Sequence, residues 1–176
     1  MSPKISIIIV HYNVTHFLKA CLFSIEKYAK DTDYEVIVID NKSTDSSWGD
    51  LIPQFPKIHF IASEDNEGFA KANNKAIKYA KGEYVLILNP DTELEGFYLN
   101  EILNFASSKS DFGCLGVRMH DANGSFLPES KRAIPDMFNS FEKLFTGFKK
   151  NNSKSYYRND INEFDVSEVE VITGAF

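Results

Sequence analysis

Cysteine, long apolar runs and an excess of positive charge are all scarce in this chain of 176 residues. Only Cys21 and Cys114 are present, in segments that predict a helix and a strand, so they form no close pair that could chelate a metal. We expect both to be buried, reduced thiols, as in a cytosolic protein. No apolar run approaches the ~18 residues that span a bilayer, and the N-terminus lacks the features of a signal peptide. Peripheral attachment to a membrane is left open.

The formal net charge of -6 argues against a nucleic-acid-binding protein, because a phosphate backbone requires a concentrated cationic surface. Any phosphate ligand would therefore need a metal ion or backbone N–H donors. A hydrophobic fraction of 43%, with 15 Phe and 8 Tyr, is enough to form a packed core in a single domain of this length.

Apolar segments of two periodicities alternate along the first part of the chain. Continuous runs rich in β-branched residues predict buried strands at residues 5–10, 36–39, 58–61 and 84–88. Segments with a helical apolar stripe lie at residues 15–29, 69–80 and 96–107, and Thr15 could cap the first of them. This alternation predicts an α/β domain, in which a mostly parallel sheet carries helices on both faces.

The regular alternation ends after a further strand predicted at residues 112–117. Asn123-Gly124 then predicts a tight hairpin turn, and an apolar stripe predicts a helix at residues 136–148. We therefore divide the chain into an α/β half, residues 1–118, and a second part, residues 119–176.

Three polar clusters follow directly after predicted strands. They are His11-Tyr12-Asn13, Asp40-Asn41 and Asn89-Pro90-Asp91. In a parallel sheet the carboxyl ends of the strands meet at one edge, and ligands bind in the crevice outside that edge. We therefore expect the three clusters to line one site.

Tyr12 and Asn13 suit the recognition of a nucleobase, because an aromatic ring can stack on it and an amide can both donate and accept hydrogen bonds. Asp40 closes an otherwise apolar strand, where its carboxylate could accept a hydrogen bond from a base N–H or a ribose hydroxyl. The ordinary alternatives are that Tyr12 and Asn13 merely end a strand, and that Asp40 caps a short helix near residues 46–51. Three nearby residues are better placed for that cap: Ser43, Thr44 and Asp45.

Asp91, with Asn89 two residues before it, places hard oxygen ligands on one loop. Such ligands suit Mg²⁺ or Mn²⁺ bridging a diphosphate, whose developing charge the metal would neutralise. The alternative is that Asn-Pro-Asp is only a common turn sequence.

The four histidines show no spacing typical of a zinc site. Lys71 and Lys75, four residues apart on a predicted helix, are interpreted as a solvated face rather than a phosphate site.

Taken together, these segments resemble family 2 glycosyltransferases of the GT-A fold. Residues 6–13 and 36–45 are similar to the family's first two strands, and residues 66–76 to its Asn-x-Gly-Phe segment and following helix. Residues 88–92 occupy the place of its Asp-x-Asp metal motif. The resemblance implies a Rossmann-like GT-A sheet and the inverting transfer of a sugar from a nucleoside-diphosphate sugar to a glycan or lipid-linked acceptor.

The resemblance also implies a divalent cation, Mg²⁺ or Mn²⁺, with Asp91 as its ligand. The implied nucleotide-binding residues are His11, Tyr12, Asn13, Asp40, Asn41, Gly68, Asn74, Asn89 and Asp91. A role in polysaccharide biosynthesis follows from the same resemblance, in the cytoplasm and with peripheral attachment at the inner face of the cell membrane left open.

One residue departs from the family pattern, because Asn89 stands where the first acid of the metal motif is found. This departure resembles the rhamnosyltransferase-like branch of the family, which implies a deoxysugar donor such as rhamnose. Losing one carboxylate should weaken metal binding, so the strictness of metal dependence is left open.

In the family, the acidic base that deprotonates the acceptor lies beyond the Gly-Ala turn that Gly174-Ala175 resembles. We therefore expect the base after Phe176, name no catalytic residue, and expect residues 119–176 to begin an acceptor-side half that leaves this chain inactive or weakly active alone. Two other hypotheses stay open. The chain could be a nucleotide-binding module without turnover, or an unrelated doubly wound domain without nucleotide affinity.

Overall fold

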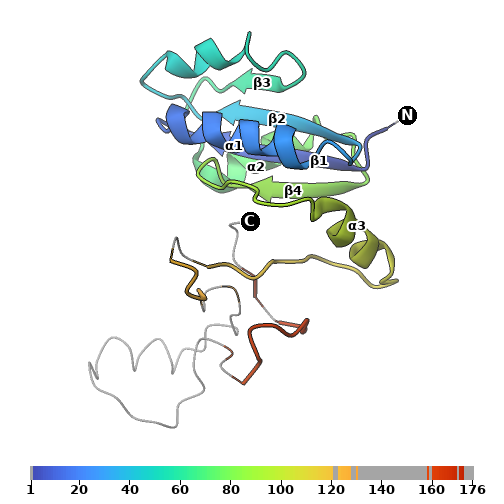
Figure 1. Ribbon diagram of the computed structural model, residues 1–176. Coiled ribbons are helices and arrows are strands. Elements are labelled where there is room, and N and C mark those ends of the chain that lie inside the picture. Colours follow the sequence, from blue (N-terminus) through green and yellow to red (C-terminus); the bar gives the residue numbers. More distant parts are fainter. Residues whose placement is uncertain are drawn as a thin grey trace, which may run out of the picture. The chain divides into compact units, whose positions relative to one another are not determined.

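A computed structural model describes residues 2–120, 123–127, 130, 158, 160–169 and 171–172. The chain divides into two compact units, one that reaches Phe112 and one that starts at Gly113. The first unit contains the named helices and strands (Figure 1). In chain order these are β1 (Ile5–His11), α1 (Thr15–Tyr28), β2 (Tyr34–Asp40), the 3₁₀ helix η1 (Ser47–Leu51), β3 (His59–Ala62), α2 (Gly68–Ile77), β4 (Tyr84–Leu88) and α3 (Leu99–Ser107).

The sheet of the first unit has the strand order β3-β2-β1-β4, and every pairing in it is parallel. β1 lies between β2 and β4, and its pairing with β2 runs from Ile5↔Tyr34 to His11↔Asp40. The chain moves outward from β1 to β2 and β3, and then crosses back to place β4 on the other side of β1. The direction of winding therefore reverses beside β1, and ligands bind at such a reversal in open α/β sheets.

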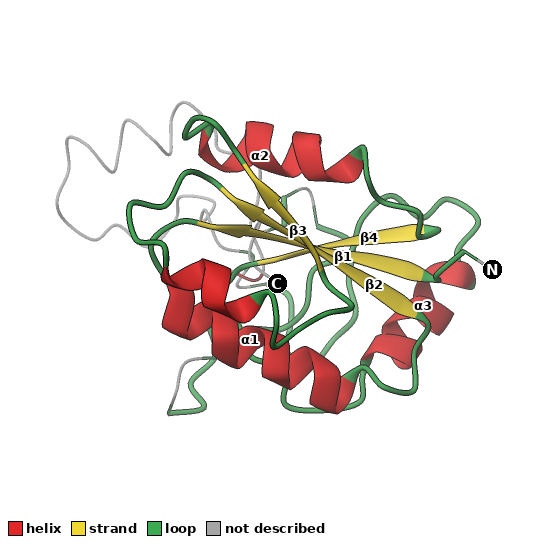
Figure 2. Cartoon of the chain, turned by 90° about the horizontal axis from the view of Figure 1, so that it is seen from above, coloured by secondary structure: helices red, strands yellow, loops and turns green. Residues whose placement is uncertain are grey.

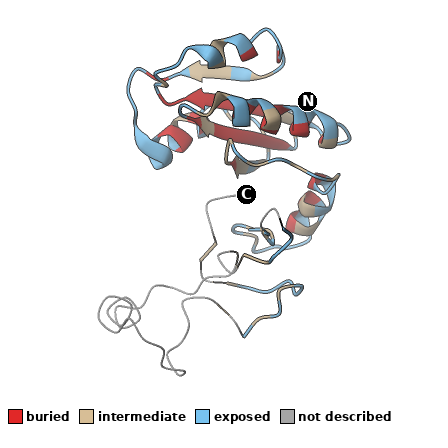
Figure 3. Ribbon diagram, turned by 60° about the vertical axis from the view of Figure 1, so that its left-hand side comes forward, coloured by how far each residue is buried: buried red, intermediate tan, exposed pale blue. Residues whose placement is uncertain are grey.

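Helices cover both faces of the sheet, with α1 and α3 on one side and α2 on the other (Figure 2). Successive residues of a strand point to opposite faces, so Ile7 and Ile9 join the core under α1 whereas Ile8 joins the core under α2. The core under α1 also contains the buried ring of Phe55, whereas the buried residues of the core under α2 are small or aliphatic. β1 and β2 are largely buried (Figure 3). The predicted α/β architecture, with a parallel sheet and helices on both faces, is confirmed.

Several predicted element ends differ from the structure. The N-cap residue of α1 is Val14, without a side-chain cap, so the predicted capping role of Thr15 is wrong. Thr15 instead places its hydroxyl oxygen 3.4 Å from His11 Nε2. α2 ends at Ile77, because the next residues close shorter turns, with the Ala80 N–H donating to the Ile77 carbonyl. α3 begins at Leu99, three residues later than predicted, since Gly96 is a poor helix former.

The strand predicted at residues 112–117 is wrong, because this segment of the chain runs without regular structure. None of its residues is buried, so its apolar side chains gain too little by burial to hold a strand in place. Cys114 is exposed, which corrects the expectation of two buried thiols.

The hairpin predicted at Asn123-Gly124 is confirmed in the second unit. His120 and Phe126 form an antiparallel bridge, and the Leu127 N–H donates to the Met119 carbonyl at 2.9 Å. Gly124 has φ of 81°, a conformation that a glycine adopts without a steric penalty. The helix predicted at residues 136–148 lies outside the described residues, as does the Gly174-Ala175 turn.

Candidate functional site

The parallel sheet brings the three predicted polar clusters to one edge. β1, β2 and β4 end at His11, Asp40 and Leu88, and the clusters begin at or directly after these residues. Because the strands are parallel, their carboxyl ends lie on the same side of the first unit (Figure 1). The expectation of one shared edge is therefore met.

Asp40 is held in a tight turn at the end of β2. Its exposed fraction is 4%, and its two carboxylate oxygens accept hydrogen bonds from the Ser43 N–H at 3.2 and 3.1 Å. Lys42, inside this turn, has φ of 63°. The N–H of Ser47 at the start of η1 donates to Asp45 Oδ1 at 2.8 Å. The carboxylate that accepts a hydrogen bond from the first turn of this short helix is therefore that of Asp45, not that of Asp40. Asp40 retains free lone pairs, because a carboxylate accepts about four hydrogen bonds.

His11 lies beside Asp40 and is completely buried. Nε2 of His11 is 3.8 Å from Oδ1 of Asp40, and the two residues are paired in register between β1 and β2. Burial lowers the pKa of His11 below its usual 6.5, although the negative charges of Asp40 and Asp45 oppose this shift. At neutral pH His11 is therefore a neutral ring next to a carboxylate.

Asn13 connects the loop after β1 to the loop after β2. Its side-chain oxygen accepts hydrogen bonds from the Thr44 N–H at 2.8 Å and the Thr44 hydroxyl at 3.2 Å, and its own N–H donates to Ser43 Oγ at 2.9 Å. Asn13 has φ of 56°, a left-handed conformation that asparagine tolerates better than most residues. The neighbouring Tyr12 is 44% exposed, so its ring is available to a ligand.

Asn41 organises the loop that precedes α2. Its amide nitrogen donates to Asn66 Oδ1 at 2.9 Å, and its side-chain oxygen accepts from the Glu67 N–H at 2.9 Å. Asn66 Oδ1 also accepts from the Gly68 N–H at 3.0 Å, where Gly68 adopts φ of 71°. Asn41 is buried, so in this structure it holds the loop rather than facing solvent. Sequence reasoning singled out Asn41 and Gly68 but not the hydrogen bonds that join them.

The two asparagines of α2 differ in environment. Asn74, the residue implied by the resemblance, is exposed, whereas Asn73 is 3% exposed. Asn73 donates to the Phe69 carbonyl at 2.9 Å, and its side-chain oxygen is buried without a hydrogen-bond partner among the described residues. Helical periodicity could have signalled this difference, because Asn73 follows the buried Ala72 on the same face as the buried Ala76.

The sequence predicts that Lys75 belongs to a solvated face, but in the structure its side chain contacts two polar residues. Its Nζ lies 3.2 Å from Ser63 Oγ and 3.6 Å from Glu67 Oε2, and its side chain is 33% exposed. Ser63 in turn donates its N–H to the Asp40 carbonyl at 2.9 Å. Ser63 was not singled out from the sequence. For Lys75 the available signal was its position next to the buried Ala76.

The Asn89-Pro90-Asp91 loop follows β4 and closes a turn in which the Thr92 N–H donates to the Asn89 carbonyl at 3.2 Å. Asn89 is half-buried and Asp91 is exposed. Their two side-chain oxygens are hard ligands that suit a divalent cation. No group of three or more His, Cys, Asp or Glu able to hold a metal occurs among the described residues. The loop therefore fits a cation only if a ligand such as a diphosphate completes its coordination.

Cys21 lies under this loop, with its sulfur 3.8 Å from the Asn89 carbonyl oxygen. Burial, with the charges of Asp91 and Glu93, raises the pKa of the Cys21 thiol to about 12. At pH 8 only about one thiol in 10,000 with such a pKa is the reactive thiolate.

We expect a disulfide exchange reagent at pH 8 to modify Cys114 rapidly and Cys21 only after unfolding. Two fast-reacting thiols in the native chain would show that Cys21 is accessible.

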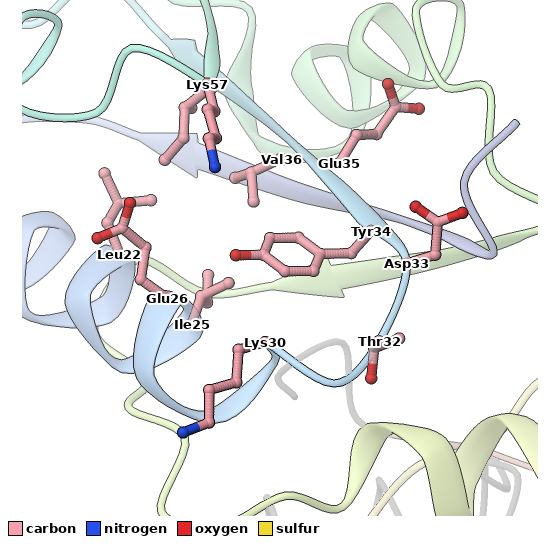
Figure 4. A pocket seen from close by; sticks show the side chains of 11 residues that line it. Leu22, Ile25, Glu26, Lys30, Thr32, Asp33, Tyr34, Glu35, Val36 and Lys57 are labelled. Carbon is pink, nitrogen blue, oxygen red and sulfur yellow. The ribbon is translucent and has the colours of Figure 1, made fainter. Parts of the chain in front are cut away.

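A cavity of about 420 Å³ lies at the opposite end of β2 (Figure 4). Tyr34 projects its ring into this cavity, and burial, with the negative charge of Glu26, raises the pKa of its hydroxyl. Its walls come from α1, from the first residues of β2 and from the segment before β3, including Leu22, Val36 and Lys57. None of the predicted site residues lines it, so it is separate from the polar edge described above.

In the part of the chain that the structure describes, no helix is long and apolar enough to cross a bilayer.

Comparison with protein families gives one match that covers most of the chain. The model described as "Glycosyl transferase family 2" matches residues 6–165. Among curated proteins, the Poly(ribitol-phosphate) beta-glucosyltransferase of Bacillus spizizenii is 36% identical over 142 residues, which cover 76% of this chain and 22% of that protein. The Poly(ribitol-phosphate) beta-N-acetylglucosaminyltransferase TarS of Staphylococcus aureus (strain Mu50) is 28% identical over 140 residues, which cover 76% of this chain and 24% of that protein. The chain thus spans about a quarter of these relatives.

Among solved structures, the fold of this chain is similar to that of TarS from S. aureus. The crystal structure of S. aureus TarS 1-349 in complex with UDP-GlcNAc matches with a TM-score of 0.60 and 29% identity, covering 72% of this chain and 37% of that chain. The complex of the same protein with UDP matches with a TM-score of 0.61 and 27% identity, covering 72% of this chain and 38% of that chain.

Proposed function

The chain belongs to glycosyl transferase family 2 and has the α/β GT-A fold of its structural neighbours, and from this we propose that its first unit binds the nucleoside diphosphate of a sugar donor at the carboxyl edge of the sheet. The sugar is then transferred, with inversion, to a glycan or lipid-linked acceptor. The observation that supports this most directly is the buried Asp40 carboxylate, which closes β2 next to β1 with lone pairs left for a ligand.

Each side chain at the edge has a role that follows from its chemistry. Asp40 accepts a hydrogen bond from the base or the ribose, and the exposed ring of Tyr12 stacks on the base. Asn13 and Asn41 act mainly by holding the loops around Asp40, because their side-chain oxygens already accept backbone hydrogen bonds. Gly68 begins α2, and its N–H already donates to Asn66 Oδ1, so Gly68 helps to hold the loop before α2. Asn74 is exposed on α2, and the family resemblance supports a further donor contact through its side chain.

The donor that we propose is a UDP-linked hexose or N-acetylhexosamine. The names of the relatives support this choice, since they specify a beta-glucosyltransferase and a beta-N-acetylglucosaminyltransferase, and one neighbour was crystallised with UDP-GlcNAc. The rhamnosyltransferase-like branch, suggested by Asn89, is the competing hypothesis for the same site. Calorimetric titration with UDP, dTDP and GDP separates the two: tightest binding of UDP supports our proposal, and tightest binding of dTDP supports the rhamnosyl hypothesis.

We propose that Asp91, assisted by Asn89, holds a divalent cation together with the donor diphosphate. The cation would neutralise the charge that develops on the leaving group. This requires no further protein ligand, because Mg²⁺ is commonly held by one or two carboxylates plus substrate phosphates. Metal and nucleotide should then bind cooperatively.

The metal hypothesis predicts that UDP binds more tightly in excess Mn²⁺ than in chelator, by about 5-fold or more, a typical size for coupling between two ligands. In Asp91→Ala the difference between the two conditions should disappear. Asp111→Ala, which removes an exposed carboxylate after α3, is the matched control and should behave as the parent does. Equal UDP affinity of the parent chain with Mn²⁺ and with chelator would show that no cation is shared at this loop.

Binding without turnover is the competing function for the chain by itself, because it spans about a quarter of the curated relatives above. Release of radioactive sugar from UDP-glucose or UDP-GlcNAc, with and without a poly(ribitol phosphate) acceptor, distinguishes turnover from binding. We also propose a cytoplasmic location on the basis of the family resemblance; peripheral attachment to the membrane is left open.

A further inference from the structure

His11 is a titratable side chain that the fold buries beside the candidate nucleoside site. It is the last residue of β1, its exposed fraction is 0%, and its Nε2 lies 3.8 Å from Asp40 Oδ1. The same nitrogen lies 3.4 Å from Thr15 Oγ1. On the other side of the ring, Nδ1 is buried and has no hydrogen-bond partner among the described residues. The polar contacts of the ring are therefore confined to one side, where the Asp40 carboxylate lies within 4 Å of Nε2.

Burying an imidazole in this position lowers the stability of the fold relative to an apolar side chain. A buried nitrogen without a partner costs free energy, and an apolar side chain of similar size would avoid that cost. The Nε2–Asp40 distance is too long for a good hydrogen bond to a neutral ring, but it allows a strong attraction to a charged one. The geometry thus suits a ring whose effect on Asp40 changes with its protonation.

We propose that His11 is a positioning residue for Asp40 that makes nucleoside binding sensitive to pH, because the protonated ring competes with the nucleoside for the Asp40 carboxylate. This inference rests on the proposed function, since it assumes that the nucleoside contacts Asp40. The neutral ring leaves the free lone pairs of Asp40 to the ligand. The charged ring draws the carboxylate into an ion pair.

The charged groups that face His11 set the pH range. Asp40 comes from β2 and Asp45 from the loop after it, and both favour the protonated ring. α1 contributes the uncharged Thr15, and the pairing of β1 with β4 ends at Ile9↔Leu88, before His11. Burial is the largest influence and keeps the pKa of His11 below 6.5. The ring is therefore neutral at pH 8, and the competing charged form accumulates only as the pH falls below 6.5.

The test uses uridine as the ligand, because UDP carries a terminal phosphate that itself titrates near pH 6. Uridine affinity of the 176-residue chain is measured by NMR at pH 8 and pH 5. We expect the parent to lose about 5-fold or more in affinity between these two values, the size typical of coupling between two bound species. His11→Asn, which removes the titrating group but keeps a polar side chain, should change by less than about 2-fold over the same range. His59→Asn, at an exposed position of β3, is the control and should retain the parent's pH dependence.

A second measurement does not depend on the ligand. The ring of His11 is titrated by NMR in the parent and in Asp40→Asn, where loss of the carboxylate should shift the titration of His11 to lower pH. An unchanged titration, or the same loss of uridine affinity in His11→Asn as in the parent, overturns the inference while leaving the nucleotide site intact. A parent chain that binds neither uridine nor UDP at pH 8 refutes the proposed function itself, and the inference with it.

Discussion

Replacing Asp40 with alanine is expected to weaken UDP binding about 10- to 150-fold, because a charge-assisted hydrogen bond in a partly buried site is worth about 1.5–3 kcal/mol. The carboxylate is 4% exposed and lies at the carboxyl end of β2, where it is held by the Ser43 N–H. A pyrimidine base N–H or a ribose hydroxyl that donates to Asp40 would lose its partner in the variant. Isothermal titration calorimetry at pH 8 in the presence of Mn²⁺ measures the effect.

Two further variants separate recognition from loop order. Asp40→Asn retains an oxygen that can accept from Ser43 but loses the negative charge, so its UDP affinity should fall between the parent and Asp40→Ala. Asp50→Ala removes an exposed aspartate of η1 and should leave the affinity unchanged. Circular dichroism checks that each variant is folded. Binding of UDP by a folded Asp40→Ala chain as tightly as by the parent would remove Asp40 from the site.

Replacing Gly82 with alanine should destabilise the fold by about 1–3 kcal/mol, the usual cost of forcing extra atoms into a packed region. A Cβ at this position would lie 2.5 Å from the Ser6 backbone nitrogen and 2.7 Å from the Ile5 carbonyl carbon. These are backbone atoms of the central strand, so they cannot move aside without disturbing the sheet. The Gly82 N–H also donates to Ser6 Oγ at 2.8 Å, and that contact would be stretched. Urea unfolding followed by circular dichroism measures the change.

Gly49 provides the matched control for this prediction. A Cβ built on Gly49 meets no atom within 4 Å, and its φ is not in the left-handed region. Gly49→Ala should therefore be neutral or stabilising by up to about 1 kcal/mol, because alanine restricts the unfolded chain. Equal free energies of unfolding for the two variants would mean that the segment before β4 is not packed against β1.

The contact between the Gly82 segment and β1 matters for the site because it fixes where β4 begins. Ser6 Oγ donates to Glu35 Oε1 at 2.6 Å, and the Lys81 N–H donates to the same carboxylate oxygen at 2.6 Å. These bonds join β1, β2 and the segment that precedes β4 at the amino end of the sheet. Since β4 pairs with β1 in fixed register, they also help to position Asn89 and Asp91 at the other end.

The sequence by itself determined the elements whose signal is local. Runs of β-branched residues placed the first four strands to within a few residues, and Asn123-Gly124 placed the hairpin, because backbone conformation there depends on neighbouring side chains. The alternation of strands and helices was sufficient to predict a parallel sheet, and therefore one edge shared by His11, Asp40 and Asp91. The same local signal gave a wrong prediction at residues 112–117, because none of these residues is buried and the segment forms no strand.

The tertiary structure alone decided which polar side chains are buried and what they contact. Sequence spacing could not show that Asn13 holds the Ser43–Thr44 loop 30 residues away, or that Asn73 rather than Asn74 is buried. Nor could it show that His11 and Asp40 stand in register on adjacent strands. These facts depend on strand register and on the angle of α2 against the sheet. Both are set by the packing of side chains from distant segments, which no local pattern contains.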